Sequence, residues 1–209
     1  MPGKVSKLDG AKRQLETAID LFFDSQDSLS VHTLAWAAFK VLFDLYPHRS
    51  DDGFATKLDS IIGKEGWRSM SGVANFLKHA DKDPEALLVS HHPMQGMALI
   101  GLATILYRRI AGEFTVKMMA FDYCMEELAF DELGIPEADE NKERAARFRA
   151  IRNQIRDLPF DAQIVVAKKL YLSFLENYEV ARSRVEQANA DGLTVTQLLD
   201  RHIPNRDFG

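Results

Sequence analysis

The stretch 31–46, VHTLAWAAFKVLFDLY, decides the fold. Read at 3.6 residues per turn, it carries two apolar stripes, and only Thr33, Lys40 and Asp44 form a polar strip between them. Pro47 follows directly and ends the segment, because proline cannot continue the hydrogen-bond ladder of a helix. A helix that is apolar around most of its circumference lies at the centre of a bundle or also contacts a partner. This segment therefore predicts an all-α protein.

The rest of the chain is built from further segments with a helical period. They predict an all-α multi-helix bundle of six to eight helices around a core of four to six helices. Residues 1–136 form the helical-bundle core in this interpretation, and residues 137–209 add a basic helix and a long helix that pack on the same bundle as one domain. No alternation is strong enough to build a sheet. The further helices are expected at about 7–23, 54–62, 67–80, 93–110, 115–133 and 141–156, followed by a long helix that Asp161 caps.

Local signals mark where some of these helices begin, break or approach one another. Ser28 or Ser30 can cap the central helix, because serine side chains accept hydrogen bonds from the free amides of a first turn. Gly63 and Gly66 bracket a break between two helices. Gly96 belongs to a set of small residues in 93–110 that would let a neighbouring backbone approach closely.

Composition restricts the class of protein. The 209 residues are 46% hydrophobic and 27% charged, which suits a globular chain, and the net charge of −5 disfavours a general nucleic-acid binder. Cys124 is the single cysteine, so neither an intrachain disulfide nor a thiolate zinc cage is possible. The N-terminus lacks the apolar core of a secretory signal, and the longest apolar stretch, 94–107, is shorter than the ~20 residues that span a bilayer. We expect a cytoplasmic protein without membrane association.

The most suggestive polar pattern lies in the helix expected at 67–80. Arg68, Gly72, Asn75 and His79 follow one another at steps of four, three and four, which places them on one stripe of a helix. Gly72 leaves room for a ligand, and imidazole can act as a general acid or base near neutral pH. Arg68 and Lys78 could hold an anion. The alternative is a hydrogen-bonded polar seam between helices, with His79 capping carbonyls at the helix end.

The same segment supports a resemblance. Residues 75–81, NFLKHAD, resemble a segment of an uncharacterised bacterial all-α protein family and are loosely similar to the HEPN superfamily of helical bundles. Asn75 and His79 match the Asn and His of the HEPN motif, while Ala74 stands where that motif has arginine. The resemblance implies a dimeric, metal-independent ribonuclease of the toxin or defence type. In that interpretation His79 is the general acid or base, Asn75 orients a group, and Arg68 stabilises phosphate charge.

A second group of residues raises the possibility of a metal site. His79, Asp81, Asp83, His91 and His92 lie close together in sequence, and imidazole and carboxylate are ligands of zinc, iron and manganese. The spacing matches no metal motif, and the side chains of two adjacent histidines tend to diverge. We therefore expect no metal and no cofactor, and a polar loop between two helices is the alternative.

The stretch 142–156 is strongly basic, with six basic residues against one acidic residue. Lys142, Arg149, Arg152 and Arg156 share one face of a helix and could bind phosphate groups of RNA. The alternative is a solvated face, or one that pairs with an acidic face of the same bundle.

The last long helix carries an apolar seam at steps of three and four, which is typical of packing on the chain's own bundle or of a dimer. We expect a homodimer, with RNA or a protein as a further possible partner. The favoured function is a binding or regulatory module, and whether the chain is an enzyme stays open; the alternatives are the HEPN-like ribonuclease and a metal-binding helical protein. The seam consists of Ile164, Ala167, Tyr171, Phe174, Tyr178, Ala181 and Val185.

Overall fold

The computed structural model describes residues 3–79, 81–88, 91–133, 153–155 and 157–190. Within these ranges the chain is helical and contains no strand, which confirms the all-α prediction. None of the helices described is long and apolar enough to cross a membrane. The elements are α1 (Lys7–Phe23), α2 (Ser28–Leu45), the 3-10 helix η1 (Tyr46–His48), α3 (Phe54–Lys78), α4 (Pro93–Ala111), α5 (Val116–Leu133) and α7 (Phe160–Ala190).

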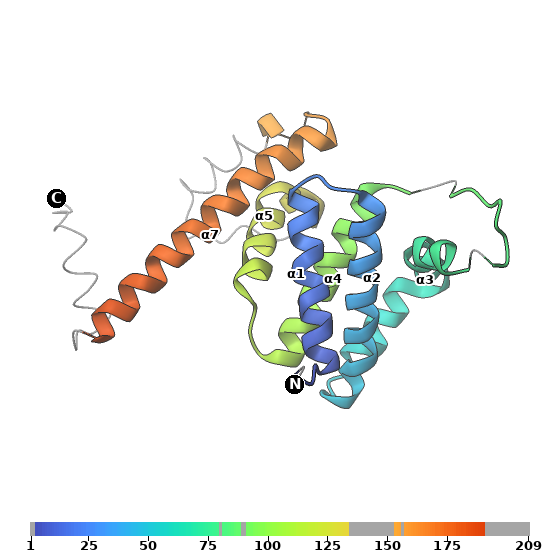
Figure 1. The fold of residues 1–209 in the computed structure, drawn as a ribbon, viewed down its shortest axis with the longest axis horizontal. Helices are drawn as coiled ribbons and strands as arrows, with labels where there is room; N and C mark the ends of the chain where they lie inside the picture. Colours follow the sequence, from blue (N-terminus) through green and yellow to red (C-terminus); the bar gives the residue numbers. More distant parts are fainter. Residues whose placement is uncertain (1–2, 80, 89–90, 134–152, 156, 191–209) are drawn as a thin grey trace.

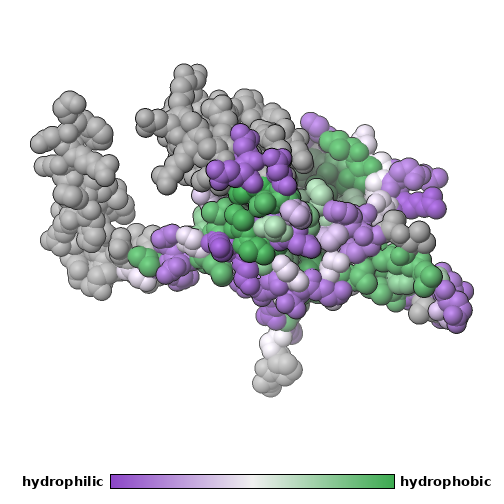
Figure 2. All heavy atoms as spheres, turned by 90° about the horizontal axis from the view of Figure 1, so that it is seen from above, coloured by the Kyte–Doolittle hydropathy of each residue, from purple (hydrophilic) through white to green (hydrophobic). Residues whose placement is uncertain are grey.

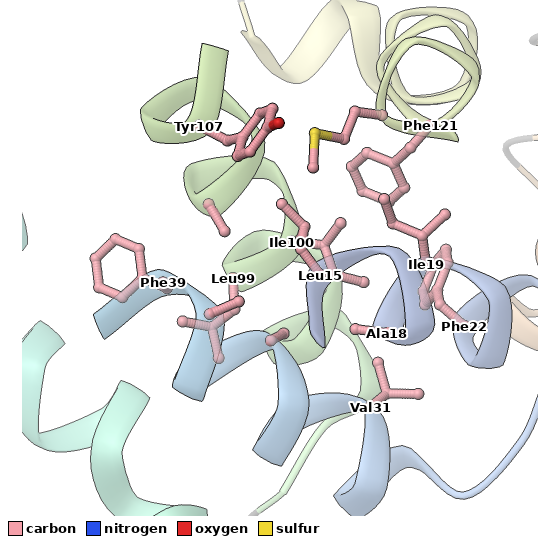
Figure 3. Close-up of a cluster of buried hydrophobic side chains, with 14 of the residues drawn as sticks. Leu15, Ala18, Ile19, Phe22, Val31, Phe39, Leu99, Ile100, Tyr107 and Phe121 are labelled. Atoms are coloured by element: carbon pink, nitrogen blue, oxygen red, sulfur yellow. The ribbon is translucent and has the colours of Figure 1, made fainter. Parts of the chain in front are cut away.

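The helix α2 lies at the centre of the bundle, as its sequence predicts. It packs against α1, α4 and α3, and α5 and α7 cover α1 from the opposite side (Figure 1). Leu15 and Ile19 of α1 meet Leu99 and Ile100 of α4 in one apolar cluster, shown in Figure 3. Phe39 of α2 packs against Trp67 of α3, with ring centroids 5.7 Å apart and tilted planes. Both apolar stripes of α2 therefore pack on other helices of the chain, although Leu34, Val41 and Phe43 stay partly exposed.

The helix α3 contains the break that the sequence indicates. Gly63 has φ +59° and ψ 176°, a backbone conformation that side chains other than glycine rarely adopt, and it kinks α3 into two helical pieces. Gly66 lies inside the second piece and does not widen the break. The kink turns Trp67 and Met70 toward α2, where both pack against the core.

The start of α2 differs from the expectation. Asp27, and neither Ser28 nor Ser30, is the N-cap. Its carboxylate accepts hydrogen bonds from both the backbone N–H and the hydroxyl of Ser30, at 2.8 and 2.7 Å. The carboxylate prevails because it accepts two bonds at once and carries the charge that the positive end of a helix favours. Ser28 becomes the first helical residue, and its hydroxyl is left for another contact.

The expected close approach of two backbones occurs at Gly96 of α4. A Cβ atom at this position would lie 3.1 Å from Cγ1 of Val31 and 3.6 Å from the backbone nitrogen of His32. Gly96 therefore lets α4 lie close against the first turns of α2. This contact places the start of α4 beside His32. His91, the residue before the N-cap of α4, packs against His32 there.

The seam of α7 packs on its own chain over the first half of the helix. Ile164, Ala167 and Tyr171 are buried, and Phe174 lies 5.4 Å from the ring of Tyr123 in α5. Beyond that point α7 extends past the bundle, as the orange helix in Figure 1 shows. The side chains of Ala181 and Val185 lie outside the part of the chain that is described.

A polar network ties α4 to the turn before α3. Arg109 donates hydrogen bonds to the Tyr46 hydroxyl at 2.7 Å and to the Asp52 carboxylate at 2.8 Å, and its guanidinium stacks over the ring of Phe54. Asp52 also accepts the backbone N–H of Phe54. These bonds, led by that of the Phe54 amide, hold the pKa of Asp52 well below its usual range. The network fixes where α3 begins.

Candidate functional site

A surface pocket of about 330 Å³ opens between α3 and the first turn of α4. Ser69 and Gln95 join its two sides, since the Gln95 amide donates a hydrogen bond to the Ser69 hydroxyl at 3.4 Å. The pocket is polar along its rim and apolar at Val73 and Leu88. Its lining residues are Glu65, Arg68, Ser69, Gly72 and Val73 of α3, Leu88 of the connecting segment, and Gln95 of α4.

Two members of the predicted stripe, Arg68 and Gly72, meet in this pocket. They lie one turn apart on α3, so both face the same opening. A Cβ atom at Gly72 would meet no atom within 4 Å, so the glycine borders open space. This placement agrees with the expectation that Gly72 leaves room beside Arg68.

The charge that the pocket offers comes from side chains. Arg68 and Glu65 stand on its rim, and both are exposed. The amides of the first turn of α4 are already used, because the Met94 N–H donates to Nδ1 of the N-cap residue His92 and the Gln95 N–H donates to the carbonyl of His92. A bound anion would therefore be held by the Arg68 guanidinium, the Ser69 hydroxyl and the Gln95 amide.

The other two members of the stripe lie elsewhere. Asn75 is exposed, and its amide donates to the Ser71 hydroxyl at 3.3 Å. His79 is half-buried at the C-cap of α3, where its backbone N–H donates to the carbonyl of Asn75. Neither residue lines the pocket that contains Arg68. The structure thus brings together Arg68 and Gly72, and leaves Asn75 and His79 one to two turns further along the helix.

The remaining candidate residues do not join the pocket either. Lys78 is exposed at the end of α3, and Arg149, Arg152 and Arg156 lie outside the described residues. His91 and His92 diverge as expected: His91 contacts Ser28 of α2, and the ring of His92 lies 5.9 Å from Phe160 of α7. Among the described residues, no three His, Cys, Asp or Glu side chains gather as metal ligands would.

A buried pair of imidazoles, which helical spacing did not predict as a pair, lies where the first turns of α2 meet the start of α4. His32 of α2 is fully buried, and its Nε2–H donates to the Met70 carbonyl at 2.9 Å. The ring of His91 packs edge-on against it, with centroids 5.5 Å apart and planes at 75°. The Nδ1 atoms of both rings are buried and make no hydrogen bond within the described part of the chain. The only sequence signal was an imidazole on an apolar face of α2.

Burial lowers the pKa of His32 below its ordinary value. The hydrogen bond to Met70 acts in the opposite direction, and the neighbouring His91 lowers the pKa further. A proton added at Nδ1 of His32 would be buried without an acceptor and would stand beside a second imidazole. Burial and the neighbouring imidazole therefore favour the neutral form of His32, with its proton on Nε2 bonded to the Met70 carbonyl.

Acidification is expected to destabilise this joint. The pKa of His32 is lower in the folded chain than in the unfolded chain, so at mildly acidic pH the unfolded chain binds more protons. The free energy of unfolding therefore falls as the pH drops below about 6.5. Urea unfolding between about pH 7.5 and pH 5 measures this fall. His32→Gln, whose amide can still donate to Met70 but does not titrate, should reduce the pH dependence. An unchanged pH dependence in this variant would assign it to other groups.

Comparison with known proteins adds no relative. No family model, no curated protein and no solved structure matches the chain.

Proposed function

We propose that the protein is a binding or regulatory module whose ligand occupies the pocket between α3 and α4. The observation that carries the proposal is that Arg68, Gly72 and Gln95, from two different helices, line one opening of about 330 Å³. This volume lies in the range of pockets that bind small molecules. Binding of a small molecule requires a pocket with a few polar groups that point into it, and Arg68, Ser69 and Gln95 are such groups here.

The chemistry of the lining supports a small ligand with an anionic group. The guanidinium of Arg68 is permanently charged and can bind a carboxylate or a phosphate group through two parallel hydrogen bonds. Ser69 and Gln95 add a hydroxyl and an amide, while Val73 and Leu88 offer an apolar wall. Glu65 on the same rim would repel a second negative charge or pair with an amine. A ligand that carries a single anionic group beside an apolar part suits this lining best.

The test is a titration of the full chain with butyrate and with inorganic phosphate, followed by amide chemical shifts. Binding of such minimal probes is expected at dissociation constants on the order of 1 mM. Arg68→Gln should weaken binding by roughly 10- to 100-fold, because a charge-assisted hydrogen bond is worth about 1.5–3 kcal/mol. The shifts should concentrate around residues 65–73 and Gln95.

Lys78→Gln is the matched control, because it removes the same charge from an exposed position of the same helix that does not line the pocket. It should leave the affinity unchanged within about twofold. Equal weakening by both variants would indicate general charge attraction and would overturn the proposal.

The ribonuclease alternative makes a different demand on the same helix. It requires His79 to act on RNA as general acid or base, with Asn75 orienting a group and Arg68 stabilising phosphate charge. His79→Ala should then abolish RNA cleavage while leaving the binding of butyrate to the pocket unchanged, because His79 does not line it. This alternative carries less support, since Asn75 and His79 lie outside the pocket that holds Arg68.

Homodimerisation stays a prediction. The apolar stripes of α2 that favoured it pack largely within the chain, and the first half of the α7 seam is buried there too. Figure 2 shows apolar side chains, in green, interspersed with polar ones on one face of the molecule. On the described part of α7 the large exposed apolar side chains are Val165, Leu172 and Val180, so a second copy would pack along that helix.

A further inference from the structure

A serine and a histidine meet at the start of the central helix, away from the pocket described above. The Ser28 hydroxyl lies 3.0 Å from Nε2 of His91, although 63 residues separate them in the chain. Ser28 is free for this contact because Asp27 has taken over the capping of α2. A hydroxyl within hydrogen-bond distance of an imidazole nitrogen is the arrangement by which a serine is activated as a nucleophile.

Ser28 also lines a small cavity of its own. The cavity has a volume of about 90 Å³ and lies where the α1–α2 turn meets the first turns of α4 and α7. A cavity of about 150 Å³ can hold benzene, so this one suits an acyl group of a few carbon atoms. Its walls are Phe22, Val31, Pro93, Phe160 and Ile164, and its polar members are Ser25, Gln26, Ser28 and Asp161.

The surroundings hold the ring of His91 in place. Its ring packs edge-on against His32, which is itself held by the Met70 carbonyl. The carboxylate of Asp27 accepts two bonds from Ser30, and these bonds are the main cause of the lowered pKa of Asp27. Attraction to His91 lowers the pKa of Asp27 to a smaller extent. The Ser28 hydroxyl is thus fixed between the capping residue of α2 and a ring-packed imidazole.

We propose that Ser28 is a nucleophile, with His91 as its general base, that accepts a short acyl group from an activated ester. The Ser28 oxygen forms a bond to the ester carbonyl carbon while its proton passes to Nε2 of His91. The tetrahedral intermediate then expels the alcohol, which takes the proton from His91, and the acyl group remains on Ser28 as an ester. Water then attacks this ester and gives a proton to Nε2 of His91. The Ser28 oxygen leaves, takes that proton back, and a carboxylic acid is released.

The site favours acylation over rapid turnover. The N–H of Ser30, a donor at the start of α2, is already bonded to Asp27 and does not serve an oxyanion. His91 is oriented by ring packing, and within the described residues no acceptor binds its Nδ1. We therefore expect an acyl-enzyme that accumulates and hydrolyses slowly.

The experiment mixes the full chain with p-nitrophenyl acetate and follows the burst of p-nitrophenol together with the mass of the protein. The expected result is one acetyl group per chain, mapped by peptide mass to Ser28. Ser28→Ala should abolish the burst. Ser25→Ala is the matched control, since Ser25 lines the same cavity and has no contact with His91. His91→Gln should slow acetylation by at least about 100-fold, as loss of a general base does.

Circular dichroism and a thermal melt establish that each variant is folded. If Ser28→Ala does not fold, Ser28→Cys takes its place, because a thiol keeps both the size of the residue and a nucleophile, and it should be acetylated at the same position. The proposal is overturned if the acetyl group is found on lysines alone, or if Ser28→Ala and Ser25→Ala are acetylated at the rate of the parent chain.

Discussion

Replacing Phe39 by alanine is expected to lower the free energy of unfolding by about 3–5 kcal/mol. Phe39 is completely buried in α2, and its ring lies about 6 Å from the rings of Trp36 and Phe43 and 5.7 Å from that of Trp67. The truncation leaves a cavity in the middle of this aromatic cluster, which the rigid neighbouring rings cannot fill. Because Trp67 comes from α3, the damage falls on the contact between the two helices.

Urea unfolding of the parent chain and of Phe39→Ala measures this loss. Each kcal/mol corresponds to a fall in melting temperature of about 2–4 °C for a chain of this size. Phe39→Leu is the control, since it keeps most of the apolar volume and should cost clearly less than the alanine variant. Equal stability of Phe39→Ala and the parent chain would mean that α3 does not pack on α2 as described.

Replacing Tyr171 by alanine is expected to have an effect of similar size, about 3–5 kcal/mol, and to release α7 from the bundle. The Tyr171 ring stacks on Phe23 of α1, with centroids 4.2 Å apart and planes at 20°. Its hydroxyl donates to the Asp20 carboxylate at 2.9 Å, and Lys117 of α5 binds the other oxygen of that carboxylate at 2.5 Å. Asp20 of α1 thus links Tyr171 of α7 to Lys117 of α5.

The comparison of Tyr171→Ala with Tyr171→Phe separates packing from hydrogen bonding. The phenylalanine variant keeps the stacking and leaves Asp20 paired with Lys117, so it should cost only about 1 kcal/mol. Amide hydrogen exchange should show that Tyr171→Ala loses protection mainly in α7, while α2 and α4 stay protected. Uniform loss of protection over all helices would contradict a separately docked α7.

Two features of the fold could be predicted from the sequence alone. The central place of α2 follows from residues 31–46 alone, because a helix with apolar residues on most of its surface can be stable in water only when other helices cover it. The break at Gly63 was equally readable, because glycine tolerates a backbone conformation that other residues avoid. Such features depend on neighbours in the chain.

Only part of the candidate site could be predicted from the sequence. Helical spacing correctly placed Arg68 and Gly72 on one face, but it also placed Asn75 and His79 there, and the spacing contains no information on where a neighbouring helix ends. The start of α4 brings Gln95 to the turn of Arg68 and not to that of His79. Which part of the stripe borders a pocket therefore depended on how α4 docks.

By itself the sequence determined that the chain is all-α, which helix lies in the middle and where α3 kinks, since hydrophobic period and glycine conformation act over a few residues. Only the tertiary structure decided that His32 meets Met70 and His91, that Ser28 meets His91, and that Tyr171 of α7 meets Asp20 of α1. These partners come from segments far apart in the chain, and their distances depend on small shifts along packed helices such as the close approach at Gly96. No periodicity within one helix contains that information.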